Sequence, residues 1–451
     1  MTFVPTAGST GSGPTTVPFA GFHHRHNRPR RRMVIVVRAD PVICGHSGEA
    51  RCLAEVALTR GYDDVRIVTW PIDRLQESGL PLKPLETVLP YSPGITVERP
   101  EPVGDYRVMD GRYLAGLTGR LIELFTEGVP TVAMSLYLSP HTAAVQDAAR
   151  VARSLGVTDL VTVAEAVGSD ITNVVRNCLD SDRFGSAVQI LTTYLEADHC
   201  VAVSAFTKDI ILESAQQLDD RLGTSFTAEC RERIGISFPA VNSAPYLEQD
   251  PGRIDVALQR RGLRRGGYLL FLSRLAAAKG VDDLIEAYRN SDARHSLRLV
   301  LAGRGPREAE IREWAAASGV GDRIDILTDV DDDEKPALMA GSAAFVLPSR
   351  PQPEFVETFG IALVEAMLSG GGPVITCPTG GIIEAVGDAA VLVPAHDPVR
   401  LREAIDMVAD WPADTVAVWR ERARDQATQF DRANVFDRLA RRIATPDEGV
   451  A

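Results

Sequence analysis

Short apolar runs recur along the chain, separated by longer segments in which apolar residues return every three or four positions. In the first half these runs are MVIVV (33–37), DDVRIVTW (63–70), PTVAMSLYL (130–138), DLVTVAEAV (159–167) and ADHCVAVS (197–204). A run without regular polar alternation predicts a strand inside a parallel sheet, and the segments between the runs predict helices that cover that sheet. The alternation therefore predicts a doubly wound α/β domain.

A second series of the same kind begins near residue 268. Its apolar runs are YLLFLSRL (268–275), LRLVLAGRGP (297–306), RIDILTDV (323–330), AAFVLPS (343–349) and PVITC (373–377). We therefore predict two Rossmann-like domains, at 33–247 and 266–426, facing each other across a cleft. The polar segment 248–265 is the expected linker between them.

The two ends of the chain differ from this pattern. Residues 1–32 are rich in Gly, Ser, Thr and Pro and end in a basic run, which predicts a disordered tail because so little apolar surface can be buried. Residues 427–451 are expected to be a helix that packs back on the first domain. The apolar stripe of that helix is Val435, Leu439 and Ile443.

The amino-acid composition narrows the classes of molecule that the protein is expected to bind. The 451 residues carry a formal net charge of −13, which becomes −18 once the tail with its five arginines is set aside. Such an acidic body does not favour nucleic acid or anionic membranes. The six cysteines are scattered without a CxxC pair, so we expect free thiols. No apolar run approaches the roughly 20 residues of a membrane span, and we expect a cytoplasmic protein.

The stretch 348–372 carries the strongest chemical signal. It follows a predicted strand, places Glu357 where a loop becomes a helix, and continues through Gly360 to Glu365. A helix N-terminus offers free amides and a positive dipole end, which suit a phosphate group. Gly360 permits close approach of the backbone, and the carboxylates can bind hydroxyl groups. This combination indicates a ligand that joins phosphate to sugar.

Four motifs in the second half resemble, in order and spacing, those of the retaining GT-B glycosyltransferases of family 4. They are FLSRLAAAKGVDDLIEAY (271–288), LVLAGRGP (299–306), ETFGIALVEAM (357–367) and PTGGIIEAV (378–386). The third motif matches the E-x7-E signature of that family. The resemblance implies a GT-B fold with a donor-binding second domain and a C-terminal helix that crosses between the domains.

The resemblance also assigns roles to individual residues. It implies that Arg274 and Lys279 neutralise the diphosphate of a nucleotide sugar, that Glu357 binds the sugar, and that Glu365 binds the ribose. The remaining donor-binding residues that it implies are Gly48, Gly303, Val330, Phe359, Gly360 and Ile361. Taken singly, Arg274 also fits a surface cation and Lys279 a solvated turn residue.

The first half departs from the family at one place. Where relatives carry a histidine in an H-x-x-G turn, this chain has EAVG, with Glu165 in the place of the histidine. This departure puts an ordinary hexose donor in doubt. His46, His141 and Glu165 are therefore the candidates for the sugar or acceptor side, and a purely structural role for His141 stays open.

The resemblance implies an enzyme of the hexosyltransferase class that retains the anomeric configuration. Its co-substrate would be a UDP- or GDP-sugar, and its acceptor a small molecule. We expect no cofactor and no metal ion, because no acidic ligand set is convincing and Asp331 to Asp333 suit the start of a helix.

Several alternatives stay open. The acceptor suggested is either an aminocyclitol hydroxyl or a thiol, as in lincosamide assembly, within antibiotic biosynthesis. A sugar-nucleotide epimerase, a phosphorylase or a non-catalytic ligand-binding protein is compatible with the same fold. A homodimer is also allowed, since the sequence does not set the oligomeric state.

Overall fold

The computed structural model describes residues 30–104, 109–353 and 355–444. The tail expected at 1–32 lies outside these ranges up to residue 29, and so do residues 445–451. Among the described residues, no helix is both long enough and apolar enough to cross a membrane.

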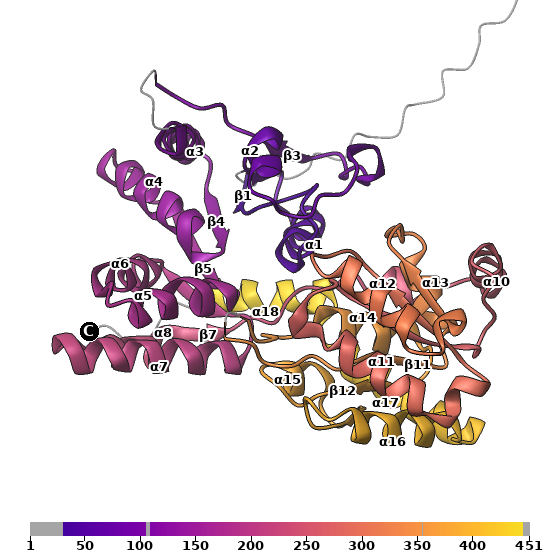
Figure 1. The fold of residues 1–451 in the computed structure, drawn as a ribbon. Helices are drawn as coiled ribbons and strands as arrows, with labels where there is room; N and C mark the ends of the chain where they lie inside the picture. Colours follow the sequence, from indigo (N-terminus) through magenta and orange to yellow (C-terminus); the bar gives the residue numbers. More distant parts are fainter. Residues whose placement is uncertain (1–29, 105–108, 354, 445–451) are drawn as a thin grey trace, which may run out of the picture.

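Seven parallel strands form the sheet of the first domain, in the order β3-β2-β1-β4-β5-β6-β7 (Figure 1). These strands are β1 (Arg32–Val36), β2 (Asp64–Val68), β3 (Ile95–Glu98), β4 (Thr131–Leu136), β5 (Leu160–Ala166), β6 (His199–Ala202) and β7 (Ile234–Ile236). Strands β2 and β3 are added on one side of β1, and β4 to β7 on the other, so the strand order switches direction between β1 and β4. Sheets of this type bind ligands beside such a switch point, at the carboxyl ends of the strands.

Six parallel strands form the second sheet, in the order β10-β9-β8-β11-β12-β13. They are β8 (Tyr268–Leu272), β9 (Arg298–Ala302), β10 (Ile324–Leu327), β11 (Ala344–Leu347), β12 (Val374–Thr376) and β13 (Ala390–Leu392). The two-domain α/β prediction is therefore confirmed.

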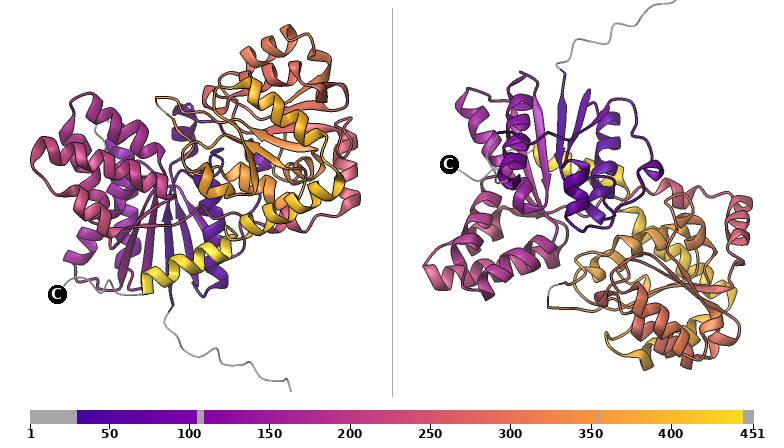
Figure 2. Two further views of the ribbon diagram at one scale, coloured as in Figure 1. Left: turned by 90° about the horizontal axis from the view of Figure 1, so that it is seen from below. Right: turned by 45° about the horizontal axis from the view of Figure 1, so that its top comes forward.

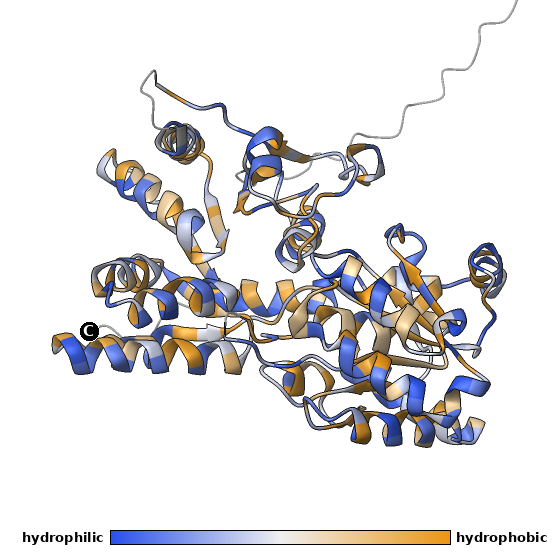
Figure 3. Ribbon diagram, in the orientation of Figure 1, coloured by the Kyte–Doolittle hydropathy of each residue, from blue (hydrophilic) through white to orange (hydrophobic). Residues whose placement is uncertain are grey.

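Helices cover the two sheets, and their blue and orange bands in Figure 3 show polar and apolar positions alternating along them. The helices up to residue 260 are α1 (Gly45–Thr59), α2 (Ile72–Glu77), α3 (Met109–Thr126), α4 (Ala143–Ser154), α5 (Arg176–Asp180), α6 (Phe184–Leu195), α7 (Ala205–Leu222), α8 (Phe226–Arg233), α9 (Ala244–Leu247) and α10 (Pro251–Arg260). Those that follow are α11 (Val281–Asn290), α12 (Glu308–Ala317), α13 (Lys335–Gly341), α14 (Ile361–Ser369), α15 (Ile382–Val386), α16 (Pro398–Ala409), α17 (Ala413–Thr428) and α18 (Arg432–Ala444).

The first strand shows why its run is continuously apolar. Met33 and Ile35 face the core beneath α1 and α18, whereas Val34 and Val36 face the core beneath α3 and α4. All four side chains are at most 1% exposed. A strand with helices on both faces has no solvent side, so polar alternation disappears.

Two expected boundaries were wrong. Strand β1 begins at Arg32, which belongs to the folded domain rather than to the tail. The expected linker contains α10, whose Ile254 and Leu258 are buried in the core of the second domain. Helix α1 begins at Gly45, where Cys44 accepts a hydrogen bond from the Ser47 amide and caps the helix.

The C-terminal helices join the two domains. Helix α17 packs against α14 in the second domain, and after a short break α18 runs to the first domain, as Figure 2 shows in yellow. Val435 and Leu439 of α18 are buried beside residues of α1, and Ile443 packs at the edge of the same cluster. Arg60 and Asp437 add an ion pair of 2.7 Å to this contact.

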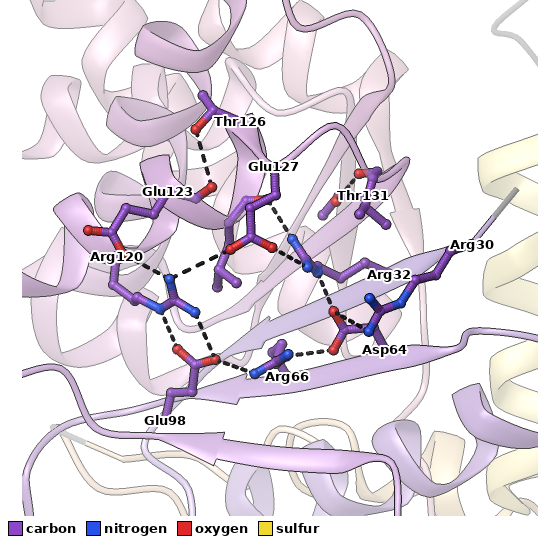
Figure 4. A network of polar contacts seen from close by, with 12 residues as sticks. Arg30, Arg32, Asp64, Arg66, Glu98, Arg120, Glu123, Thr126, Glu127 and Thr131 are labelled. Carbon is purple, nitrogen blue, oxygen red and sulfur yellow. Dashed lines mark hydrogen bonds and ion pairs between the residues drawn. The ribbon is translucent and has the colours of Figure 1, made fainter.

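Arg32 is the centre of a buried polar network at the amino ends of the first strands (Figure 4). Its guanidinium group lies 2.7 Å from the Asp64 carboxylate and 2.5 Å from that of Glu127, and it donates to the Leu124 carbonyl oxygen at 2.6 Å. Burial alone raises the pKa of Asp64, but hydrogen bonds from Arg66 and Arg32 outweigh it and hold this pKa below its usual value.

We predict that Arg32→Ala lowers the free energy of unfolding by about 3 kcal/mol, because the buried Asp64 carboxylate loses its hydrogen bond from Arg32 and keeps only Arg66 and the more distant Arg30. Urea unfolding measures the loss. The matched control is Arg150→Ala, which removes two exposed ion pairs in the same domain and is expected to cost less than about 1 kcal/mol. Equal losses in the two variants would contradict a structural role for Arg32.

Candidate active site

The segments that follow β8 and β11 bring the three predicted catalytic residues together. Lys279 forms an ion pair with Glu357, and it is only 5% exposed. The Lys279 ammonium group lies 4.9 Å from the centre of the Phe355 ring, and the guanidinium carbon of Arg274 lies 5.4 Å from the same centre. Lys279 is therefore not a solvated turn residue.

Positive charge exceeds negative charge at this place. Arg274 has no carboxylate partner in the part of the chain that the structure describes, and its side chain is exposed. Lys279 has one carboxylate partner, Glu357. Together the three residues leave about one uncompensated positive charge, which suits an anionic ligand.

The N-terminus of α14 adds hydrogen-bond donors to this charge. Gly360 precedes the helix at φ +98°, and no side chain caps this end of the helix. The first amides of α14 are therefore available to a ligand, and the helix dipole favours a negative one.

Helix α1 of the first domain starts opposite α14. A Cβ atom placed on Gly45 would lie 3.0 Å from Cδ1 of Ile361, so the two helix starts approach each other across the domain boundary. A Cβ placed on Gly48 would meet nothing within 4 Å. The structure thus leaves open space beside Gly48, which the resemblance implied to be a donor-binding residue.

Direct contacts between the domains hold these parts in place. The Thr358 hydroxyl donates to the Val167 carbonyl oxygen at 3.0 Å. The Glu384 carboxylate accepts from the amides of Ala205 and Phe206, at 2.7 and 3.0 Å, at the start of α7. The loop before α14 is therefore fixed against the first domain on the side that carries Glu357.

Glu365 lies one turn further along α14 and is held by two donors. The Tyr246 hydroxyl and the Lys335 ammonium group both approach its Oε1 atom, at 2.7 and 2.6 Å. Its Oε2 atom has no hydrogen-bond partner among the described residues. On the same side, Lys83 of the first domain forms an ion pair of 2.6 Å with Asp332 of the second.

Two further predicted donor-binding residues, Gly303 and Val330, contribute to the packing of the second domain. Gly303 follows β9 at φ +144°, and a Cβ atom there would lie 1.9 Å from the Ser273 carbonyl oxygen, so only glycine fits. Val330 is half-buried against the core of the second domain.

The side chain of Phe359 does not reach the site, which is a correction to the sequence prediction. It is 2% exposed and stacks against Phe238 and Phe430, with ring centres 5.6 and 4.9 Å away. It anchors the loop before α14 to the segments that connect the domains, and its side chain offers nothing to a ligand.

His141 is satisfied within the first domain. Its Nδ1 atom lies 2.9 Å from the Leu136 carbonyl oxygen, and its Nε2 atom accepts from the Trp70 indole at 3.1 Å. Burial lowers the pKa of His141 to about 4, so the ring is neutral. Both nitrogens are occupied, and the structural role that the sequence left open is the one observed.

His46 lies on the first turn of α1 beside Tyr137, at 6.2 Å between ring centres. Burial, followed by the charges of Arg38, His141 and Arg274, lowers its pKa to about 3, so the imidazole is neutral. The helix that carries His46 starts opposite α14 of the second domain.

The side chain of Glu165 is 0% exposed, so it does not line the candidate site. Its carboxyl group lies against that of Glu49 on α1, and neither of its oxygens has a hydrogen-bond partner among the described residues. Burial raises the pKa of Glu49 to about 7, and burial together with the Glu49 charge raises the pKa of Glu165 well above its usual value. The pair therefore holds at least one proton near neutral pH.

The sequence analysis missed a cavity of about 540 Å³, one wall of which is Trp70, the residue that donates to His141. It lies in the first domain, and Arg38, Trp70 and Tyr113 are among the residues that line it. Arg38 directly follows the first predicted strand, and Trp70 is the last residue of the second. The rule that drew attention to Arg274, a polar or aromatic residue at the carboxyl end of a parallel strand, could have found them.

Within the described ranges, no three His, Cys, Asp or Glu side chains are grouped so that they could hold a metal ion. The six cysteines are free thiols, as expected.

Comparison with known proteins gives a family match for the second domain. Residues 261–426 match the model of the family described as glycosyl transferases group 1. A 2-deoxystreptamine glucosyltransferase from Streptomyces kanamyceticus is 28% identical over 220 residues, which cover 47% of this chain and 55% of that protein. A D-inositol 3-phosphate glycosyltransferase from Acidothermus cellulolyticus is 30% identical over 228 residues, 48% of each chain. The chain thus spans about half the length of the curated relatives it matches.

Solved structures agree over nearly the whole chain. HepE from Anabaena, in complex with UDP and glucose, superposes with a TM-score of 0.66 and 18% identity and covers 92% of this chain and 100% of that one. WaaG, a glycosyltransferase involved in lipopolysaccharide biosynthesis, gives a TM-score of 0.62 at 16% identity. At these identities the likeness shows the fold, which is GT-B.

The buried Glu49 and Glu165 pair predicts a pH dependence of stability. The folded protein keeps protons that the unfolded chain releases near pH 4.5, so the free energy of unfolding should fall as pH rises through about 7. Glu165→Gln should flatten this fall, since a neutral amide can donate to an ionised Glu49.

Urea unfolding at several pH values between about 5 and 8 measures the effect. Glu196→Gln, at an exposed position of the same domain, serves as the control and should retain the wild-type slope. An unchanged slope in Glu165→Gln would show that the proton held by this pair does not cause the pH dependence.

Proposed function

We propose that the chain is a retaining glycosyltransferase, which moves a sugar from a nucleotide diphosphate sugar to a small-molecule acceptor. The observation that carries the proposal is the convergence of Arg274, Lys279 and the free N-terminus of α14 on one place, with Glu357 beside them. The family match of residues 261–426 and the GT-B fold support it.

The chemistry of the leaving group explains the arrangement. As the bond between the anomeric carbon and the phosphate oxygen breaks, negative charge grows on the departing diphosphate. Arg274, Lys279 and the α14 amides are placed to stabilise that charge, and fixed donors of this kind supply a large share of enzymatic rate enhancement. Glu357, oriented by its ion pair with Lys279, would bind hydroxyl groups of the sugar.

Retention follows from transfer on a single face of the sugar. The acceptor oxygen or sulfur forms the new bond to the anomeric carbon, and its proton passes to the phosphate oxygen that leaves. We assign no carboxylate nucleophile. Glu357 is tied to Lys279, and an ion-paired carboxylate is a weak nucleophile.

Glu365 is the proposed ribose ligand, because its Oε2 atom stays free while Tyr246 and Lys335 fix the other oxygen. UDP is the first nucleotide to test, since HepE was solved with UDP and glucose. The names of relatives that act on 2-deoxystreptamine and on D-inositol 3-phosphate favour a small cyclic polyol as acceptor. Antibiotic biosynthesis, a cytoplasmic location and a thiol acceptor belong to the same proposal.

We predict that Lys279→Ala lowers kcat by roughly 10²–10³-fold, the range found when one donor to a developing anion is removed. Release of nucleoside diphosphate from a donor panel, with and without acceptor, measures the rate. Arg312→Ala, on the exposed face of α12, removes one charge elsewhere in the second domain and should leave kcat unchanged. Nucleotide release that does not depend on acceptor, with an epimerised sugar recovered, would replace transfer by epimerisation.

We also predict that EDTA leaves the initial rate unchanged, because two cations and helix amides neutralise the diphosphate without a metal ion. The rate is compared before and after chelation, and again after addition of Mg²⁺. A loss of activity that Mg²⁺ restores would mean that a metal ion takes part in neutralising the leaving group.

A further inference from the structure

The cavity of about 540 Å³ lies where ligands enter sheets of this type. Its walls come from segments after β1, β2 and β4, beside the switch point between β1 and β4, and from α2 and α3. Its volume is in the range of pockets for small molecules, about 300–1,000 Å³. Trp70, Tyr113 and Leu114 give it an aromatic and apolar wall.

The two arginines that line the cavity differ in whether a carboxylate compensates their charge. Arg74 lies 3.2 Å from the Glu77 carboxylate and is also paired with Asp110, so its charge is compensated. Arg38 has no carboxylate partner and makes no hydrogen bond from its side chain within the described ranges. Its guanidinium carbon lies 4.9 Å from the centre of the Tyr137 ring. Arg38 is half-buried, and a half-buried cation without a counter-ion favours binding of an anion.

The position of Arg38 relates the cavity to the donor side. Arg38 lies over the Tyr137 ring, and the centre of that ring lies 6.2 Å from that of His46 on the first turn of α1. The start of α1 faces the N-terminus of α14, so these contacts lead from Arg38 toward the proposed donor site of the second domain. Arg38 is held on the first domain, whereas Arg274 and Lys279 serve the diphosphate from the second.

We propose that Arg38 binds an anionic group, a carboxylate or a phosphate, carried by the acceptor, while Trp70 and Tyr113 contact its ring. The proposal rests on the proposed function and narrows its substrate class. Trp70 suits this task because its indole donates to His141 and its carbonyl oxygen accepts from Arg99 at 2.6 Å, which fix its orientation. A planar guanidinium fork matches both carboxylate and phosphate oxygens.

The test uses the full chain saturated with the nucleoside diphosphate that binds best, so that the donor site is filled. Calorimetry then compares glucose, glucuronate and glucose 6-phosphate, which are one ring with a neutral, a carboxylate or a phosphate group. The expected result is that at least one of the two anions binds about 10- to 100-fold more tightly than glucose, as for a charge-assisted hydrogen bond. The two anions distinguish a carboxylate from a phosphate acceptor.

Arg38→Ala should abolish the preference for the anion, and Arg38→Lys should keep part of it through its charge. Arg150→Ala, on the surface of the same domain, should retain it in full. Circular dichroism spectra show whether each variant is folded. If Arg38→Ala does not fold, the comparison is made with Arg38→Lys.

Three results would overturn the proposal. In the first, the preference for the anion survives in Arg38→Ala. In the second, the wild-type protein binds neither anion more tightly than glucose. In the third, Arg38→Ala loses affinity for the nucleoside diphosphate, which would place Arg38 in the donor site. If no nucleoside diphosphate binds the wild-type protein at all, the proposed function itself fails. The two failures are thus distinguishable.

Discussion

Uncompensated positive charge at the carboxyl ends of the strands is the constraint on which this structure depends. The chain as a whole carries a net charge of −13, yet Arg38 and Arg274 have no carboxylate partner among the described residues, and Lys279 has one. Helices α1 and α14 point their N-termini at the same region. An acidic body keeps anions away from most of its surface, so an anionic ligand gains most by binding where cations and helix ends converge.

Close contact between the two domains keeps that region in place. The Thr358 hydroxyl binds the Val167 carbonyl oxygen, and a Cβ atom on Gly168 would lie 2.0 Å from the Thr358 side chain. Helix α18 adds a second attachment, since its apolar stripe is buried in the first domain. The loop before α14 is thereby fixed on both sides, and Glu357 with it.

The sequence predicted the positions of the proposed donor-binding residues in the second domain, because these residues follow successive strands of one sheet. Arg274, Lys279 and Glu357 are separated by up to 83 positions, but the β/α pattern alone places them at one edge. It could not predict contacts made by side chains between elements. Phe359 packs into an aromatic cluster and Glu165 meets Glu49, and both depend on which segments pack together, which periodicity does not contain.

The most direct measurement compares a nucleoside diphosphate with its nucleoside in calorimetric titrations of the wild-type chain and of the double variant Arg274→Ala, Lys279→Ala. The base is whichever of uracil, guanine and adenine binds best as the diphosphate. Capture of the diphosphate by cations and helix amides predicts that it binds at least roughly 100-fold more tightly than the nucleoside, and that the double variant loses most of this difference. Equal affinity for both ligands in the wild-type chain, or an undiminished preference in the variant, would contradict the account.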